Sequence, residues 1–206
     1  KYDSAAIQFK RAIKLWRTAE IHPMIAIWYK RIASGYLYLG RYHEAIAYAD
    51  SALDYLGPPN FDPPNTKHSP SILWAKGVGY QLMGDYFRAL RYYNQAHDIN
   101  SVSREGAWEY AIAIDYTNIA VAHRHLGDFE TTIQYYDKAL NILNEINAPY
   151  QKILQTESSR AFTYGKMGAY DRAIPALRRV VRSYEGLPAS KPHTIEAIHN
   201  LVNSLS

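Results

Sequence analysis

The sequence predicts an all-α protein in which antiparallel helix pairs stack side by side. One phrase recurs four times, beginning at Gly40, Gly84, Gly127 and Gly168, at intervals of 44, 43 and 41 residues. Within each copy, apolar and small residues recur at helical spacing behind a glycine turn, as in the segment LGDFETTIQYYDKAL at 126–140. Self-similarity at such a period is typical of stacked helical repeats.

Composition supports a folded, core-forming chain and excludes several classes of protein. Of 206 residues, 48% are hydrophobic and 20% are charged, unlike a disordered chain. The net charge of +4 is scattered and forms no basic stripe of the kind that nucleic acid requires. Cysteine is absent, which excludes disulfides and thiolate metal sites. No apolar run approaches the length of a membrane span and no signal peptide is visible, so the compartment stays open, with the cytoplasm expected.

The first part of the chain is expected to begin halfway through a repeat. Residues 2–16 align with the second half of the repeat unit, and no glycine turn precedes them. Pro23 suits the first turn of a helix that runs to about Leu39. Its partner follows Gly40, whose residue type favours the left-handed conformation at a helix end, and continues to about Leu56.

A long loop is predicted at 57–70, because this stretch holds five prolines and several turn formers. Loops of this length are uncommon in compact domains and are often functional. We interpret the stretch as a connector, with a binding element as the alternative.

The remaining helices follow at regular intervals. Ser69 and Pro70 are predicted as the cap and first position of a helix that stops at Gly84. Asp128 is expected to cap the helix that follows Gly127. Pro175 lies inside a predicted helix and should introduce a local kink, because it cannot donate to the carbonyl of Asp171. The later helices are expected at about 85–99, 107–126, 128–146, 149–167, 169–184 and 194–205.

These elements predict a single solenoid of about ten helices. The expected partition is a half repeat at 1–21, full repeats at 22–69, 70–106, 107–147 and 148–190, and a half repeat at 191–206. A lone helix pair cannot bury its own apolar face, so stacking is obligatory. Phe9 and Trp16 at one end, and Ile198 and Leu205 at the other, should therefore have an open flank. We expect the native protein to continue past both ends, or the ends to pack on another copy.

The pattern resembles the tetratricopeptide repeat. That family places a large residue, Leu, a small residue and an aromatic on its first helix, then Ala, an aromatic and Ala on its second. The four full repeats match with Tyr29, Ile32, Ala33, Tyr36, Ala45, Ala49 and Ala52; Leu73, Lys76, Gly77, Tyr80, Ala89, Tyr93 and Ala96; Tyr116, Ile119, Ala120, His123, Thr132, Tyr136 and Ala139; and Glu157, Arg160, Ala161, Tyr164, Ala173, Leu177 and Val180. Lys76, Glu157 and Arg160 depart from the pattern, since these positions are usually apolar. The long period is similar to that of kinesin light chains, Rap regulators and bacterial sensor arms.

The resemblance implies that the first helix of each pair lines a concave groove. Residues on that stripe mix aromatics, aliphatics and a few cations, which suits a peptide with apolar anchors and some negative charge. The predicted groove residues are Lys30, Ser34, Tyr38, Trp74, Val78, Gln81, Thr117, Val121, Arg124, His125, Ser158, Phe162 and Lys166. The alternative is that several of them touch the neighbouring helix or the 57–70 loop.

No catalytic arrangement stands out, so we expect no enzyme activity and no cofactor. The sequence lacks HExxH, a phosphate-binding glycine loop and GxSxG. No His pair at i, i+4 exists on a helix, so we predict no metal site. His123 occupies the aromatic packing position, whereas His125 faces elsewhere. Arg178, Arg179 and Arg182 form a small basic patch, interpreted as a solvated face, with docking of an acidic partner as the alternative.

The function predicted from these features is a non-catalytic scaffold that binds a protein or peptide in the groove. We expect it to be the regulatory or sensor arm of a larger signalling protein. One alternative is an oligomerisation module that acts through the open ends. The other is RNA binding, which the modest charge disfavours.

Overall fold

The described part of the chain is entirely helical, as predicted. The computed structural model describes residues 22–56, 68–102, 108–185 and 202. Its eight helices are α2 (His22–Tyr38), α3 (Tyr42–Leu56), α5 (Ser69–Leu82), α6 (Tyr86–Val102), α7 (Trp108–His125), α8 (Phe129–Glu145), α9 (Tyr150–Lys166) and α10 (Tyr170–Glu185). The predicted half repeats at 1–21 and 191–206 lie outside the described residues, apart from Val202, as does most of the 57–70 loop.

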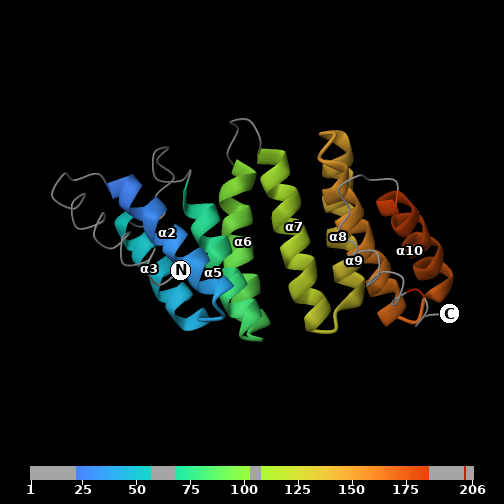
Figure 1. Cartoon of the computed structure of the whole chain (residues 1–206), viewed down its shortest axis with the longest axis horizontal. Coiled ribbons are helices and arrows are strands. Elements are labelled where there is room, and N and C mark those ends of the chain that lie inside the picture. The colour runs from blue at the N-terminus through green and yellow to red at the C-terminus, as the bar shows by residue number, and fades with distance from the viewer. Residues whose placement is uncertain (1–21, 57–67, 103–107, 186–201, 203–206) are drawn as a thin grey trace. The chain divides into compact units, whose positions relative to one another are not determined.

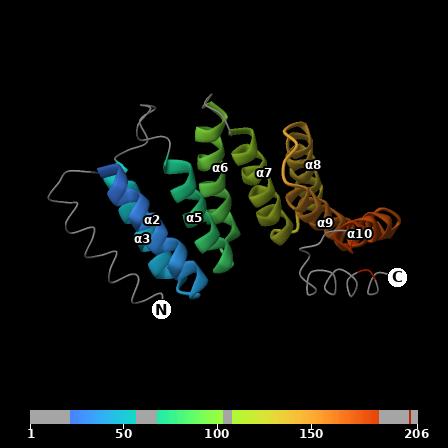
Figure 2. The ribbon, with the colours of Figure 1, turned by 45° about the horizontal axis from the view of Figure 1, so that its top comes forward.

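The helices form antiparallel pairs in two compact units, one within Lys1–Arg104 and the other within Glu105–Ser206. In the first unit α2 packs on α3 and α5 on α6, and α5 also packs against α2 and α3 (Figure 1). Figure 2 shows α5 lying between the α2–α3 pair and α6. In the second unit α7 packs on α8, α8 on α9, and α9 on α10. Within each unit, every pair therefore covers an apolar face of its neighbour.

Each pair reverses direction at one of the four predicted glycines. Gly40, Gly84, Gly127 and Gly168 have φ between 72° and 83°, a conformation that strains any residue with a Cβ. At Gly127, the glycine N–H donates to the carbonyl of Arg124, and the N–H of Asp128 donates to the carbonyl of His123. The other three turns repeat both bonds at equivalent positions. These two hydrogen bonds satisfy backbone carbonyls that the helix end would otherwise leave unpaired.

Side-chain caps start some of the second helices. The Asp128 carboxylate accepts the backbone N–H of Thr131, as predicted, and Asp85 accepts that of Arg88 in the same way. Hydrogen bonding lowers the pKa of both carboxyls: that of Asp128 chiefly through the side chain of Thr131 and also through its backbone N–H, and that of Asp85 chiefly through the backbone N–H of Arg88.

One predicted helix start was wrong by a residue. His68, not Ser69, is the N-cap of α5, and its side chain makes no capping bond. Ser69 and Pro70 are the first two helical residues and are both buried. Proline fits either position, because none of the first N–H groups of a helix has an intrahelical partner. The position of a proline in the sequence therefore does not identify the first residue of a helix uniquely.

Small residues allow the helices of a pair to approach closely. Ala33, Ala120 and Ala161 are at most 1% exposed. At Gly77, an added Cβ would lie 2.5 Å from the ring of Tyr93 on α6; at Gly79 it would lie 2.8 Å from Ile46 on α3. The two glycines of Gly77-Val78-Gly79 therefore face opposite neighbours, and α5 is held tightly on both sides. This confirms close packing as the reason for the glycine pair.

Aromatic stacks recur at the turn end of three pairs. Tyr36 stacks on Tyr48 with ring centroids 5.3 Å apart, and Tyr80 stacks on Tyr92 at 5.4 Å. In the third pair, His123 stacks on Tyr135 at 5.7 Å, and its Nδ1 lies 3.1 Å from the Asp128 carboxylate. His123 therefore has the packing role expected of it.

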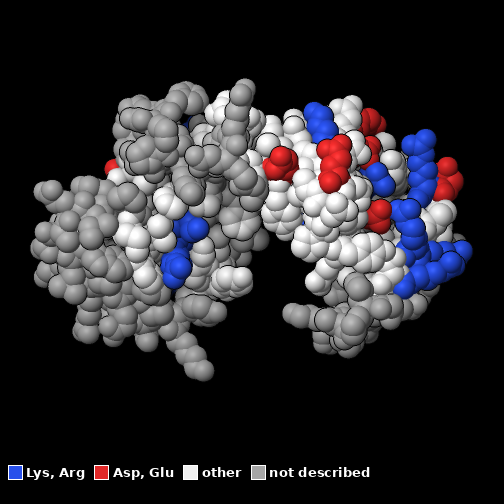
Figure 3. All heavy atoms as spheres, turned by 90° about the horizontal axis from the view of Figure 1, so that it is seen from above, with Lys and Arg blue, Asp and Glu red and all other residues white. Residues whose placement is uncertain are grey.

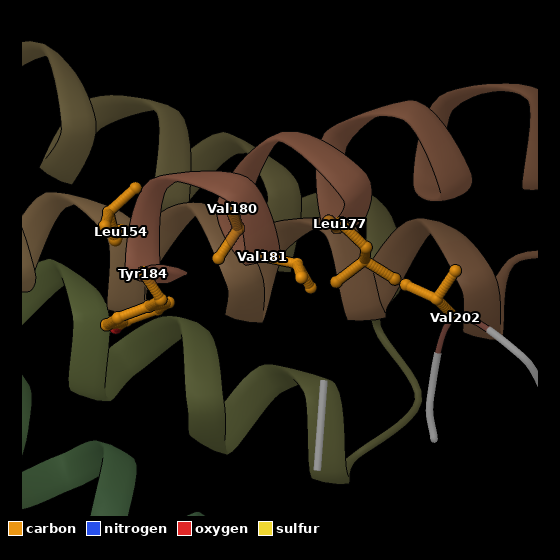
Figure 4. Packing of buried hydrophobic residues seen from close by; sticks show 7 residues of the cluster. Leu154, Leu177, Val180, Val181, Tyr184 and Val202 are labelled. Atoms are coloured by element: carbon orange, nitrogen blue, oxygen red, sulfur yellow. The ribbon is translucent and has the colours of Figure 1, made fainter. Parts of the chain in front are cut away.

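The core of the last pair is mainly aliphatic and includes one tyrosine. Leu154 of α9 meets Leu177, Val180, Val181 and Tyr184 of α10, and Val202 joins the same cluster. In Figure 4, Leu177 points toward Val202. α10 continues through Pro175 as one helix; the kink expected there stays a prediction.

Two of the three charged residues that depart from the repeat pattern, Lys76 and Arg160, form ion pairs between successive helix pairs, whereas Glu157 pairs with Arg179 inside the last pair. Lys76, only 8% exposed, contacts Asp50 of α3 and lies over the Tyr92 ring, 4.1 Å from its centroid. Burial alone lowers the pKa of Lys76, but its interactions with Asp50 and Tyr92 outweigh burial and raise it. Arg160 of α9 pairs with Asp137 of α8 in the equivalent place.

We predict that Gly77→Ala destabilises the first unit by about 1–3 kcal/mol, because the new methyl group must displace the buried Tyr93 ring. Urea unfolding followed by circular dichroism measures the change. In a Tyr93→Leu background the penalty should shrink, since the smaller side chain can move aside. An equal penalty in both backgrounds would contradict the assigned contact.

We predict that removing Asp50 destabilises the protein more than removing Lys76, its partner in the ion pair. Asp50→Ala leaves a largely buried ammonium without its carboxylate and should cost about 2 kcal/mol, discounted because Asp50 is half exposed. Lys76→Met should stay within about 1 kcal/mol of the wild type, because water can solvate the remaining carboxylate. Thermal unfolding of both variants provides the measurement. A larger loss for Lys76→Met than for Asp50→Ala would refute this account.

Candidate functional site

The predicted groove residues lie on the first helices of the pairs, α2 and α5 in the first unit and α7 and α9 in the second. In the first unit, Lys30 of α2 reaches the neighbouring first helix and donates to the Ser71 hydroxyl of α5, 3.4 Å away. Burial, and secondarily the nearby Arg31, lowers the pKa of Lys30. Lys30 therefore bridges two first helices, as a residue on their shared face should.

Other predicted residues of the first unit have differing environments. The Ser34 hydroxyl turns back on its own helix and donates to the carbonyl of Lys30. Tyr38 is 83% exposed beside the Gly40 turn. Trp74 and Val78 are half-buried. The indole N–H of Trp74 is buried and has no hydrogen-bond partner among the residues that the structure describes, so a ligand acceptor could satisfy it.

Gln81 has a partner in the core. Its side-chain oxygen accepts the hydroxyl of Tyr93, 3.1 Å away. Tyr93 is fully buried, and burial raises the pKa of its hydroxyl. Gln81 therefore satisfies a buried donor of the packing core, which gives it a structural role that the sequence pattern did not reveal.

In the second unit, two predicted cations meet one predicted aromatic ring. The guanidinium of Arg124 on α7 and the ammonium of Lys166 on α9 each lie 5.3 Å from the centroid of Phe162, also on α9. Neither cation has a carboxylate within ion-pairing distance in the described part of the chain. We call Arg124, Phe162 and Lys166 the α7–α9 cluster.

The remaining predicted residues of this unit lie on α7 and α9, the two helices that carry the α7–α9 cluster. Thr117 donates its hydroxyl to the carbonyl of Ala113. Val121 and Ser158 are half-buried, and His125 is exposed. Burial, followed by the nearby Arg124, lowers the pKa of His125, so its imidazole is largely neutral at pH 7.

The described residues hold no group of three or more His, Asp or Glu side chains that could bind a metal ion. None of the described helices is long and apolar enough to cross a membrane. A pocket of about 470 Å³ lies on α10, lined by Pro175, Arg178, Arg179, Arg182 and Ser183. The sequence identified these three arginines as a patch, but not the pocket.

Comparison with known proteins agrees with the observed fold. Residues 110–186 match the family model described as tetratricopeptide repeat. No curated protein sequence matches the chain. Among solved structures, BtubC (BKLC) of P. vanneervenii superposes with a TM-score of 0.81 at 17% identity, covering 100% of this chain and 81% of that one.

Two further structures belong to proteins whose descriptions mention a sensor or a bound factor. The STAND protein PH0952 of Pyrococcus horikoshii, described as having a tetratricopeptide repeat sensor, gives a TM-score of 0.71 at 16% identity, over 96% of this chain and 28% of that one. A Rap protein complexed with Competence and Sporulation Factor gives 0.67 at 21% identity, over 99% and 62%.

The fold and the repeated turn geometry define a helix-pair repeat protein. Residues 110–186 match the tetratricopeptide-repeat model, and the chain as a whole has a fold similar to that of BtubC (BKLC).

We predict that Gln81→Leu destabilises the first unit by about 1–2 kcal/mol, because the Tyr93 hydroxyl loses its acceptor while remaining buried. Urea unfolding gives the magnitude. Adding Tyr93→Phe should recover part of the loss, since the unsatisfied hydroxyl is then gone. If Gln81→Leu leaves the stability unchanged, the structural role of Gln81 is contradicted and only its predicted place in the groove remains.

Proposed function

We propose that the chain is a non-catalytic scaffold whose second unit binds an acidic peptide of a partner protein at the α7–α9 cluster. The observation that carries the proposal is the pair of cations on one ring, with no counter-charge from the described residues.

The electrostatics of the cluster favour an anionic ligand. Because both cations lie 5.3 Å from the same centroid, their charges are at most twice that distance apart. Two like charges within this distance repel each other, although water screens the exposed ammonium of Lys166. A carboxylate that approaches either cation would offset the repulsion and make a charge-assisted hydrogen bond.

The surroundings of the cluster favour a peptide over a small anion. Phe162 and Val121 are half-buried, so they expose apolar surface beside the cations. Apolar anchors next to a few well-placed polar groups are the usual composition of peptide-binding surfaces. A ligand with an acidic residue next to an aliphatic or aromatic one matches both features.

We further propose that this binding serves a regulatory or sensor arm of a larger signalling protein. The Rap protein that shares the fold is described as complexed with a factor, and the archaeal STAND protein as carrying a repeat sensor. Both likenesses concern the fold, and the α7–α9 cluster supplies the independent support.

Selection of random peptides on the intact chain tests the proposal. We expect enriched sequences to pair Asp or Glu with a large apolar residue. Arg124→Ala combined with Lys166→Ala should weaken binding of a selected peptide at least about tenfold, the loss expected for removing two charge-assisted contacts.

The matched control is Lys138→Ala combined with Arg172→Ala. Lys138 and Arg172 are cations of the same unit that lie over the rings of Tyr135 and Tyr164. This control makes the same change in net charge and should leave affinity within about twofold. Equal losses in both double variants, or enrichment of basic peptides, would refute the site.

A further inference from the structure

The first unit exposes large apolar side chains at the edge where its two turns lie. Tyr38 is 83% exposed, Phe87 76% and Leu82 48%, and Leu39 and Met83 beside the turn glycines are partly exposed. We call these five residues the apolar edge. Exposed apolar patches of this kind usually mark an interaction surface.

Contacts of Gly79 show that the two turns lie at the same edge of the unit. A Cβ added to Gly79, near the end of α5, would lie 3.7 Å from Leu37, near the end of α2, and 2.8 Å from Ile46, near the start of α3. The end of α5 therefore lies beside the Gly40 turn. Figure 1 shows both turns at the lower edge of the first unit.

The repeat register shows that the fold does not require apolar residues at this edge. The residues two before and three after each turn glycine are exposed in all four turns. In the first unit these residues are Tyr38, His43, Leu82 and Phe87. In the second unit they are His125, Glu130, Lys166 and Asp171. The same fold thus carries hydrophilic side chains at equivalent positions, and the surface of the second unit drawn in Figure 3 is likewise rich in charges of both signs.

Stacking of helix pairs does not cover this edge. Successive pairs pack through the sides of their helices, whereas the turns lie at the helix ends. In the second unit the positions beside Gly127 and Gly168 stay exposed although α7, α8, α9 and α10 are packed together. A further repeat would therefore extend the edge and leave the apolar residues exposed.

The charges beside the apolar edge are paired within the chain. Arg41 pairs with Glu44 at 2.7 Å, and Arg88 pairs with Asp85. Two cations and two carboxylates give this rim no net charge, so it attracts neither nucleic acid nor an anionic membrane. A rim that carries both signs can instead place opposite charges together when it meets its own copy.

We propose that the apolar edge binds the same edge of a second copy of this chain. The five residues expose about 550 Å², taking about 200 Å² for a fully exposed side chain of this size. Two such patches together bury about 1,100 Å², which is the size of a weak and reversible protein interface. A two-fold contact brings the patch onto itself. The α7–α9 cluster belongs to the other unit, so this proposal does not depend on the proposed peptide site.

Sedimentation equilibrium of the intact chain, from about 5 to about 500 μM, tests the proposal. We expect the average mass to rise from the 23.6 kDa of the monomer toward twice that value. The rise should persist between about 0.1 and about 0.5 M salt, because the contact is apolar. Leu82→Lys with Phe87→Asp copies the residues beside Gly168, keeps the net charge, and should weaken association at least about tenfold.

A second variant and a control make the result specific. Tyr38→His with Phe87→Glu copies the residues beside Gly127 and should weaken association to a similar degree. The matched control is Met167→Lys with Tyr170→Asp, which introduces Lys and Asp at the turn edge of the second unit in place of two partly exposed apolar side chains. This control should leave association within about twofold of the wild type.

The following outcomes would overturn the proposal. A chain that stays monomeric at every concentration has no such contact. A dimer that survives both variants of the apolar edge is held by another surface. An equal loss in the control would reduce the effect to general surface hydrophobicity. Binding of a monomeric chain to uncharged phosphatidylcholine vesicles, lost in Leu82→Lys with Phe87→Asp, would assign the edge to a lipid surface instead. Circular dichroism confirms that each variant is folded.

Discussion

The reversal at each turn glycine is the constraint on which the rest of the structure depends. Two backbone bonds close the helix end, and only a residue without a Cβ adopts the required φ without strain. The same two bonds form at Gly40, Gly84, Gly127 and Gly168, so every second helix follows its turn in the same hydrogen-bond register. Residues at equal distances from the glycines therefore occupy equivalent places, and the aromatic stacks and ion pairs follow from that register.

This register explains why the sequence predicted the fold well. The glycines, the small residues and the aromatics repeat at nearly constant offsets, and local backbone chemistry converts those offsets into helix pairs. Helix ends were less certain, as at Ser69, because several residue types satisfy the first turn equally well. The proline kink at Pro175 depends on a single residue without a repeat, so no other copy supports its interpretation.

The charged exceptions show where sequence reasoning was insufficient. Lys76 and Arg160 stand at positions that the family pattern reserves for apolar residues, and their partners lie on the preceding second helix. No periodicity within one helix links such residues, so the pairs become visible only when packing brings the helices together. The offset from the glycines was nevertheless available, since Asp50 and Asp137 share one position in successive copies.

The candidate site was predicted as a face rather than as a set of contacts. The helical stripe placed Arg124, Phe162 and Lys166 on first helices, but their meeting at one ring depends on how α9 packs on α8, which brings Phe162 close to Arg124 of α7. Gln81 belongs to the same stripe and instead bonds the buried Tyr93 hydroxyl. The helical spacing of residues predicts the direction in which their side chains point. Contacts with the second helix of the pair determine which of those side chains remain available for a ligand.

Within each unit, charge is used at junctions between helix pairs more than inside them. A carboxylate on one second helix meets a cation on the next first helix, and the pair is only partly shielded from water. Such pairs add little stability but penalise a wrong neighbour, because a mismatched helix would bring like charges together.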